Sequence, residues 1–351
     1  MTGAQHTEHG TAGPTLAVVA RAASVSVATA SKVVNGRADV APDTRRRVTE
    51  ALDALGYVRR PRRTPRHAPP LVDLMVRSLD TSGSGAVLRG VEEEAHRAGL
   101  EVAVSASLTR ARGGRPERSW LDRLALRGTT GVLFDHADLT PTHHARLAQL
   151  RVPYAMIDPV GEPPPGVPAV GAGDAQGARA AVRHLLGLGH TRVAVIGGHR
   201  GRRSSAARVA GYRAALAAAG LRVRPEYVRY ADAEAGLARR RTRELFALDR
   251  PPTAVLACSD PMALGVCRAL AELGLRVPED VSVVGFDDLP EARWVTPALT
   301  TVRQPLSEMA ATALRQLLRV RDGGPPPAAP AELPTRLVER CSTAPPGGVF
   351  S

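Results

Sequence analysis

The chain has 351 residues, a formal net charge of +13 and only 3% aromatic residues. This length accommodates a small domain together with a two-lobed core, and the positive charge favours a polyanionic partner. Three cysteines without CxxC spacing argue against a disulfide framework or a structural zinc site, and no apolar run is long enough for a membrane-spanning helix.

The front of the chain carries a disproportionate share of the positive charge. Residues 1–70 hold 11 Lys and Arg against 5 Asp and Glu, so about half of the net charge lies in a fifth of the chain. Residues 1–14 lack the apolar segment of a signal peptide. We therefore expect a disordered arm at 1–14, followed by a basic domain that contacts a polyanion.

Residues 15–58 predict three short helices. Thr15 is a suitable N-cap for the first, and Ser26 for a second helix over Val27–Asn35. Pro42 suits the first turn of a third helix, which runs to Leu55. A tight turn followed by a short helix with a polar face is typical of a helix-turn-helix DNA reader.

The second of these helices carries the expected reading surface. Its inward positions are Ala30, Val33 and Val34, which leaves small and polar side chains facing outward together with Lys32, the only lysine in the chain. We favour DNA contact by Lys32 over a solvated surface charge, because it lies on the helix that enters the major groove.

This segment resembles the DNA-binding headpiece of the lac repressor family of bacterial regulators. The matching pieces are TLAxVA, VSVATxSxVVNG and TRRRVxEALxxLGY. The resemblance implies that Val27, Ala28 and Lys32 meet base edges and that the hydroxyl and amide side chains around them mostly hold phosphates. With the linker arginines included, the predicted DNA-contacting residues are Thr15, Ser26, Val27, Ala28, Thr29, Ser31, Lys32, Asn35, Arg59, Arg60, Arg62 and Arg63.

Three positions depart from the family pattern. Val18 stands where the family usually has Asp, Ser24 where it has Gly, and Ala41 where it often has Ser. These changes remove part of a capping box, a residue that tolerates positive φ, and a helix cap. We therefore expect a headpiece of marginal stability in the absence of DNA or a partner subunit.

Residues 59–70 form a linker in which arginines alternate with prolines. Prolines at this density exclude a regular helix. The resemblance would place a hinge helix here, with a leucine that wedges into the minor groove, but the segment VRRPRRTPRHAPP contains no such leucine. Two alternatives stay open: arginine contacts in the minor groove or along phosphates, and a stiff solvated spacer.

From Leu71 onward, short apolar runs alternate with amphipathic helical segments, which predicts parallel sheets with helices on both faces. Two such series, beginning with LVDLMV and RVAVIGG, indicate two similar lobes with a ligand cleft at the carboxyl ends of the strands. We assign 71–343 to these lobes. The first takes about 71–160 and 300–325, and the second about 170–297 and 330–343; a Pro/Gly-rich tail follows at 344–351.

The family resemblance extends through this body, in stretches such as AVRHLLGLGHTRVAVIGG and CSDPMALGVCRALAELGLRVPEDVSVVGFDD. It implies a two-lobed α/β effector domain of the type I periplasmic-binding-protein-like fold, with the helix-turn-helix headpiece in front. In that architecture the chain crosses between the lobes three times. We expect these crossings near Val160–Gly171, Pro297–Pro305 and Gly323–Leu333.

Polar side chains that follow the predicted strands should line the cleft. Carboxylates and an arginine that converge there suit vicinal hydroxyl groups. We expect Arg208 to open the helix after VAVIGG, and Trp294 either to stack on a pyranose or to pack in the hinge. The predicted effector-binding residues are Asp80, Asp158, Arg208, Ser259, Asp260, Asp287 and Trp294. The resemblance implies this role for Asp158, Arg208, Ser259 and Asp287, with Ser259 replacing the usual Asn.

Three rival interpretations remain. An enzyme would have GAGDAQG (171–177) as a dinucleotide loop, but the segment does not follow a clear strand, and no other catalytic motif is present. A transport-type binding protein would leave the headpiece unexplained. A sensor domain without a ligand would serve only as a dimer scaffold.

We therefore predict a transcriptional regulator in the cytoplasm, associated with the nucleoid, that we expect to act as a repressor. It would bind a pseudo-palindromic operator as a homodimer and respond to a sugar-type effector. We predict no enzymatic activity, no cofactor or metal, and no membrane. The ten histidines lack metal-ligand spacing and are interpreted as loop or surface residues.

Overall fold

The computed structural model describes residues 15–34, 37, 39–55, 69–106, 116 and 118–347. The chain divides into two units, Met1–Ala68 and Pro69–Ser351. The predicted arm at 1–14, Asn35, the linker arginines and the end of the tail lie outside the described residues.

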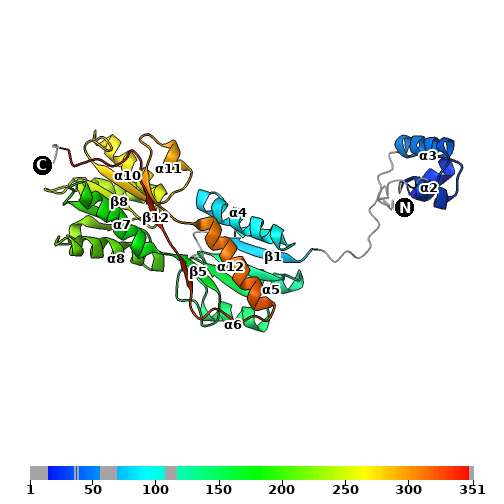
Figure 1. The fold of residues 1–351 in the computed structure, drawn as a ribbon, viewed down its shortest axis with the longest axis horizontal. Helices are drawn as coiled ribbons and strands as arrows, with labels where there is room; N and C mark the ends of the chain where they lie inside the picture. The colour runs from blue at the N-terminus through cyan, green and yellow to red at the C-terminus, as the bar shows by residue number, and fades with distance from the viewer. Residues whose placement is uncertain are drawn as a thin grey trace, which may run out of the picture. The chain divides into compact units, whose positions relative to one another are not determined.

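The first unit is a three-helix headpiece. Helix α1 (Leu16–Ala22) is followed by α2 (Val27–Val34) at an angle of 105°, and α3 (Pro42–Ala54) completes the unit (Figure 1). Their inward side chains form one small core of Val19, Ala20, Ala23, Ala30, Val33 and Val48. The predicted ends of the second and third helices agree with these bounds to within one residue.

The three departures from the family pattern accompany one strained turn and two helices that start without a side-chain cap. Ser24 adopts φ +54° in the turn between α1 and α2, a conformation that costs a residue with a side chain more than it costs glycine. Thr15 and Ala41 precede α1 and α3 without a side-chain cap. Of the three headpiece helices, α2 alone has a side-chain cap, because Ser26 Oγ accepts a hydrogen bond from Thr29 N at 3.1 Å.

Among the described residues, no single helix is long and apolar enough to span a membrane. By length and composition alone, α1 and α2 would pass that test as a bent pair.

The second unit contains two parallel sheets, each with six strands among the described residues (Figure 1). The first lobe has the strand order β11-β5-β4-β3-β1-β2. Its strands and helices are β1 (Leu71–Val76), α4 (Ser82–Arg97), β2 (Glu101–Ala106), α5 (Arg118–Leu126), β3 (Gly131–Asp135), α6 (Pro141–Gln149), β4 (Tyr154–Ile157), β5 (Ala169–Ala172), α12 (Leu306–Arg321) and β11 (Ala331–Leu333).

The second lobe repeats this arrangement with the order β12-β10-β9-β8-β6-β7, in which only β12 runs antiparallel to its neighbour. Its strands and helices are α7 (Asp174–Gly187), β6 (Val193–Gly197), α8 (Arg203–Ala218), β7 (Val228–Tyr230), α9 (Ala235–Phe246), β8 (Ala254–Ala257), α10 (Asp260–Glu272), β9 (Ser282–Asp287), α11 (Glu291–Trp294), β10 (Thr300–Arg303) and β12 (Arg336–Val338).

Helices cover both faces of each sheet, as the buried apolar runs predict. In the first lobe, α4 and α12 pack side by side over one face, and α5 and α6 cover the other. Gly90 allows the close approach of α4 and α12, because a Cβ atom there would lie 2.0 Å from the carbonyl oxygen of Ser307. The lobes therefore hold the strand ends, and the residues that follow them, on rigid frames.

The first and third crossings between lobes lie further along the chain than the sequence predicts, whereas the second falls within its predicted range of Pro297–Pro305. Residues 169–171, the end of the predicted first crossing, lie in β5 of the first sheet, so the chain crosses at Gly173. Strand β10 belongs to the second sheet, and the second crossing follows Arg303. Strand β11 belongs to the first sheet, so the third crossing lies between Leu333 and Arg336. These strands have three or four residues each, and their sheet is decided by pairing with remote strands rather than by local pattern.

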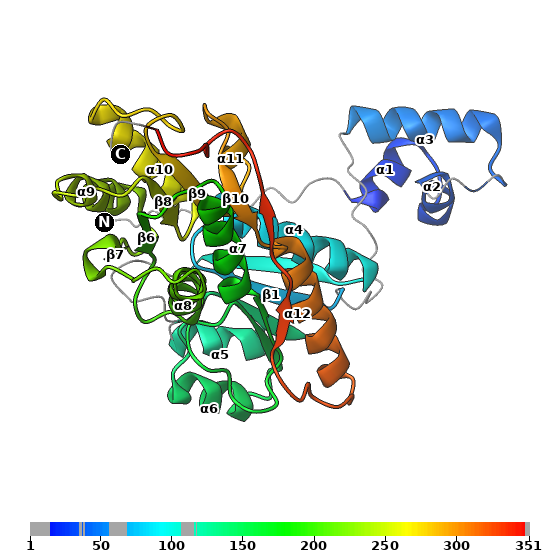
Figure 2. The same cartoon turned by 60° about the vertical axis from the view of Figure 1, so that its left-hand side comes forward.

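All three crossings lie on one side of both sheets. They join β5, β10, β11 and β12, which are the first two strands at the same end of each strand order. Figure 2 shows the segment that contains β11 and β12 passing from one lobe to the other along this side. The connections are one or two residues long, so they form a short hinge that keeps the two lobes close together on this side.

Restoring one missing cap should stabilise the headpiece. We expect Ala41→Ser to strengthen α3 by about 1 kcal/mol, since a serine at this position can accept a hydrogen bond from an otherwise unpaired amide of the first turn. Hydrogen exchange of the α3 amides in the full chain should then slow by about fivefold. Ala54→Ser, the same change at the other end of α3, is the control and should not slow exchange; equal effects would contradict the capping argument.

Candidate functional site

Arg208 is the centre of a buried ion-pair cluster in the second lobe. Its guanidinium donates from Nε to Asp174 Oδ1 at 2.7 Å and from Nη1 to Asp287 Oδ1 at 3.3 Å. Nη1 also donates to the carbonyl oxygen of Cys258 at 2.6 Å, and the guanidinium lies 3.8 Å from the centre of the Phe286 ring. One arginine thus joins the starts of α7 and α8 to the ends of β8 and β9.

Burial sets the protonation of this cluster. Burial raises the pKa of Asp174 to about 6, although the positive charge of Arg208 acts to lower it. Burial raises the pKa of Asp287 as well. Burial opposes the charge on Arg208, but Asp174, Asp287 and Asp158 together raise the pKa of the guanidinium above its ordinary value. The arginine is therefore a permanent cation surrounded by acceptors.

A second polar group stands at the strand ends of the first lobe. His136 follows β3, and its Nδ1 lies 3.0 Å from Oδ2 of Asp158, which follows β4. Burial disfavours the imidazolium, yet Asp135 and Asp158 raise the pKa of His136 to about 10. Burial also works against the charge on Asp158, but His136 holds the pKa of that carboxyl below its ordinary value. His136 and Asp158 therefore form a charged pair at neutral pH.

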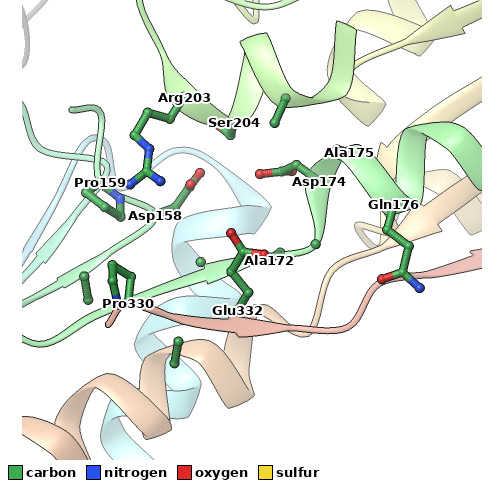
Figure 3. A pocket seen from close by; sticks show the side chains of 15 residues that line it. Asp158, Pro159, Ala172, Asp174, Ala175, Gln176, Arg203, Ser204, Pro330 and Glu332 are labelled. Atoms are coloured by element: carbon green, nitrogen blue, oxygen red, sulfur yellow. The ribbon is translucent and has the colours of Figure 1, made fainter. Parts of the chain in front are cut away.

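A cavity of about 330 Å³ opens between the lobes next to these groups. Figure 3 shows the carboxylates of Asp158, Asp174 and Glu332 directed into the same space, with Arg203 entering from α8 on the other side. The lobes contribute opposite walls: β4, β5 and β11 on one side, and the starts of α7 and α8 on the other. Such a site offers many acceptors and a few directed donors to a polar ligand.

Several polar atoms near the strand ends have no hydrogen-bond partner among the described residues. Gln304 donates from Nε2 to Asp287 Oδ1 at 2.5 Å, but its Oε1 is buried and unpaired. Asp135 Oδ1 and Ser205 Oγ are likewise buried without a hydrogen-bond partner in the described part of the chain. Buried polar groups are normally satisfied, so these atoms mark where a polar ligand would gain most.

The structure brings only part of the predicted effector set together. Asp158, Arg208 and Asp287 meet around the cavity and cluster, although Arg208 does not open α8 as predicted; that helix begins at Arg203. Ser259 is buried and caps α10 by accepting from Met262 N. Its position at the helix N-cap orients the hydroxyl toward the backbone.

The other three predicted residues lie apart from the cluster. Asp260 is fully buried, and its two carboxylate oxygens accept from Leu289 N and Thr301 Oγ1, which favours a structural role. Asp80 is exposed and pairs with Ser78. Trp294 is 77% exposed, which contradicts the alternative of packing in the hinge, and it is not among the residues that line the cavity.

Sequence reasoning missed three cluster residues. Asp174 lies in GAGDAQG, but this segment is the first hinge crossing: Gly173 N donates to Leu333 O at 2.9 Å, and Asp174 binds Arg208. The segment begins within β5 (Ala169–Ala172), contrary to the prediction that it does not follow a clear strand. His136 is not a simple surface residue, because it pairs with Asp158 in the cleft. Gln304 could have been predicted as a cleft residue from its position directly after the short strand β10.

The headpiece carries a second candidate surface, on α2. Ser26, Val27, Ala28 and Lys32 are exposed, while Ala30 and Val33 are buried in the core. Lys32 Nζ lies 2.7 Å from Asp39 Oδ2 in the segment before α3. The outward positions thus match the predicted reading face of a helix-turn-helix. Among the described residues, no group of three or more His, Cys, Asp or Glu is arranged to hold a metal ion.

Comparison with known proteins finds matches for both units of the chain. Residues 15–60 match the model of bacterial regulatory proteins of the lacI family, and residues 182–343 match the periplasmic binding protein-like domain. The chain is 35% identical over 340 residues to the HTH-type transcriptional regulator MalR of Streptomyces coelicolor, an alignment that covers 94% of this chain and 96% of MalR. The chain belongs to the lacI family of bacterial regulatory proteins.

Further members of the lacI family support the assignment. Catabolite control protein A of Priestia megaterium is 31% identical over 330 residues, covering 93% of this chain and 98% of that protein. Among solved structures, the transcriptional regulator CelR–cellobiose complex has a TM-score of 0.71 and 31% identity, covering 94% of this chain and 99% of CelR. The lac repressor dimer bound to operator and the anti-inducer ONPF has a TM-score of 0.69 and 28% identity, covering 95% of this chain and 100% of that one.

The family assignment fixes the general function. This lacI-family protein is a DNA-binding transcriptional regulator with a helix-turn-helix headpiece and a periplasmic-binding-protein-like domain. MalR and catabolite control protein A are regulators as well, which argues against an enzymatic role for the cleft carboxylates.

Removal of the central guanidinium should destabilise the second unit. We expect Arg208→Met to lower its free energy of unfolding by about 3 kcal/mol, because Asp174 and Asp287 would be left buried without their cation. Urea unfolding of the full chain, followed by fluorescence and circular dichroism, measures the effect. Arg268→Met removes an exposed arginine whose partner Glu272 keeps two others, and its midpoint should not change. Similar losses in both variants would contradict a special role for the buried cluster.

Proposed function

We propose that this protein is a repressor whose affinity for a pseudo-palindromic operator is controlled by an uncharged carbohydrate bound between the lobes. The single observation that carries the ligand assignment is the buried cluster of Arg208, Asp174 and Asp287. It presents directed donors and acceptors beside the unpaired Oε1 of Gln304. Groups of this kind suit neighbouring hydroxyls of a sugar.

Two solved relatives agree with this choice of ligand. CelR forms a complex with cellobiose, and a lacI-family regulator from Enterococcus faecium holds bound ribose. The cleft of the present chain is rich in carboxylates, with Asp135, Asp158, Asp174 and Asp287 against the cations of His136 and Arg208. This balance favours a neutral sugar over a phosphorylated one, since a phosphate would meet carboxylates at short range.

The DNA-contacting residues are those on the exposed side of α2 and around it. We infer that Val27, Ala28 and Lys32 reach base edges, while Thr15, Ser26, Thr29 and Ser31 hold phosphates. Asn35 and the linker arginines Arg59, Arg60, Arg62 and Arg63 belong to the same proposal and lie outside the described residues. A homodimer in the cytoplasm would place two such helices on the two half-sites of an operator.

Ligand binding would act through the short hinge. A carbohydrate that contacts both walls of the cleft favours one arrangement of the lobes and therefore changes the relation between paired headpieces. Coupling of this kind typically amounts to about 1–3 kcal/mol, which corresponds to a change in operator affinity of about 5- to 150-fold. Fluorescence anisotropy of the protein on DNA from its own upstream region, with non-specific competitor and a panel of sugars, tests the proposal. Specific binding that no sugar alters would favour a ligand-independent sensor scaffold.

Lys32→Ala should weaken operator binding without affecting the ligand. The expected loss is about 1–3 kcal/mol, or roughly 5- to 150-fold in Kd, if the ammonium contacts a base edge. Anisotropy on the operator and calorimetry with the sugar identified by the screen measure the two affinities. Unchanged operator affinity would show that α2 does not read DNA through this residue.

Asp287→Asn should have the opposite effect. The amide keeps the shape of the side chain but removes the charge beside Arg208, so sugar binding should fall by about tenfold or more while operator affinity without sugar stays the same. The same two assays apply. Conversion of any bound sugar to product, followed by chromatography, would instead favour an enzymatic role for the carboxylates.

A further inference from the structure

Lys32, the one lysine of the chain, is already paired in the headpiece. Its Nζ donates to Asp39 Oδ2 at 2.7 Å, and both side chains are more than half exposed. The pair therefore stands on the outer surface of the unit, in the last turn of α2, whose first turn carries the exposed Val27 and Ala28. Anything that approaches the ammonium group of Lys32 also approaches the carboxylate of Asp39.

Two hydrogen bonds of Arg37, close to Asp39 in the sequence, connect this part of the headpiece to α2 and α3. The amide of Arg37 donates to the carbonyl oxygen of Lys32 at 3.0 Å, which folds the chain back against the end of α2. Arg45 of α3 donates from Nη2 to the carbonyl oxygen of Arg37 at 2.5 Å. Arg37 is thus bound to both helices two residues before Asp39. The hydrogen bond from Lys32 lowers the pKa of Asp39 below its ordinary value. The carboxylate remains ionised wherever the regulator binds DNA.

We propose that Asp39 competes with DNA for Lys32 and thereby suppresses binding to DNA of unmatched sequence. The inference rests on the proposed role of Lys32 as a DNA contact. Random DNA offers Lys32 mainly phosphates, and each phosphate must displace a carboxylate that the fold holds at hydrogen-bond distance. The displaced carboxylate then stands next to the polyanion and repels it.

A matched operator overcomes this competition more readily. A guanine edge presents two acceptors, N7 and O6, in a fixed geometry, whereas a phosphate contact carries no sequence information. The same carboxylate can accept from the cytosine amino group of a G·C pair but finds only repulsion along the backbone. Asp39 therefore lowers affinity for random DNA more than affinity for the operator. In a headpiece with net positive charge, such a residue limits capture by the bulk of the genome.

The test compares Asp39→Asn with the wild-type full-length protein on a fluorescent duplex of random sequence, about 30 bp long, over a series of NaCl concentrations. An amide is a weaker acceptor than a carboxylate and does not repel phosphate. We expect affinity for the random duplex to rise by about three- to tenfold at low salt. The slope of log K against log salt should steepen by about one, as for one additional free cation. Affinity for an operator duplex selected by the wild-type protein should rise less.

Two further variants isolate the competition. Asp53→Asn makes the same change in net charge at an exposed position near the end of α3, and it should alter affinity by less than Asp39→Asn. In the Lys32→Ala background, Asp39→Asn should no longer increase affinity beyond the Asp53→Asn control. Thermal unfolding checks that each variant is folded.

The outcomes separate this inference from the proposed function. Equal effects of Asp39→Asn and Asp53→Asn, or a gain that persists without Lys32, would overturn the competition while leaving DNA recognition intact. If Lys32→Ala itself does not weaken operator binding, the proposed role of α2 fails, and the competition fails with it.

Discussion

The buried guanidinium of Arg208 is the interaction on which the ligand-binding body depends. A charge in the interior is tolerated only with partners, and here the partners come from α7 and from the ends of β8 and β9. Asp174 is the first residue of the second lobe after the chain crosses from the first, so the same ion pair anchors both the sheet edge and the hinge. The cluster therefore links the strand ends of the second lobe to the hinge beside the cavity.

Much of this architecture follows from local sequence. The helices of the headpiece and the long strands of both sheets have strong periodicity or continuous apolar runs, and Ser24 has the positive φ that its position in the turn suggests. Asp158 and Asp287 are identifiable as polar residues at the ends of buried strands, because parallel strands end at a common edge. Direct contacts of α2 with DNA and of the cleft with a sugar remain predictions.

The remaining features depend on contacts between remote segments. Strands β5, β11 and β12 are so short that only pairing with distant strands assigns them to a sheet, which is why local pattern misplaces the crossings. Asp174 and His136 acquire their roles from Arg208 and Asp158, more than twenty residues away in the sequence. Asp260 shows the converse error: it follows a strand like its neighbours, but the backbone of Leu289 and the hydroxyl of Thr301 occupy its oxygens. The position of a residue at a strand end selects it as a candidate. Only its contacts in three dimensions distinguish a ligand-binding residue from a structural one.

The short crossings also determine where a small motion becomes large. In the first sheet they involve β5 and β11, whereas β1, the strand that receives the linker at Leu71, lies next to the opposite edge. A lobe that turns about its hinge side behaves as a lever, and displacement grows with distance from the pivot. The attachment point of the headpiece, at Leu71, thus lies far from the hinge in the order of strands. A few degrees of rotation around a bound sugar would be magnified at Leu71, so the regulator needs no large rearrangement in the cleft to move its DNA-reading helices.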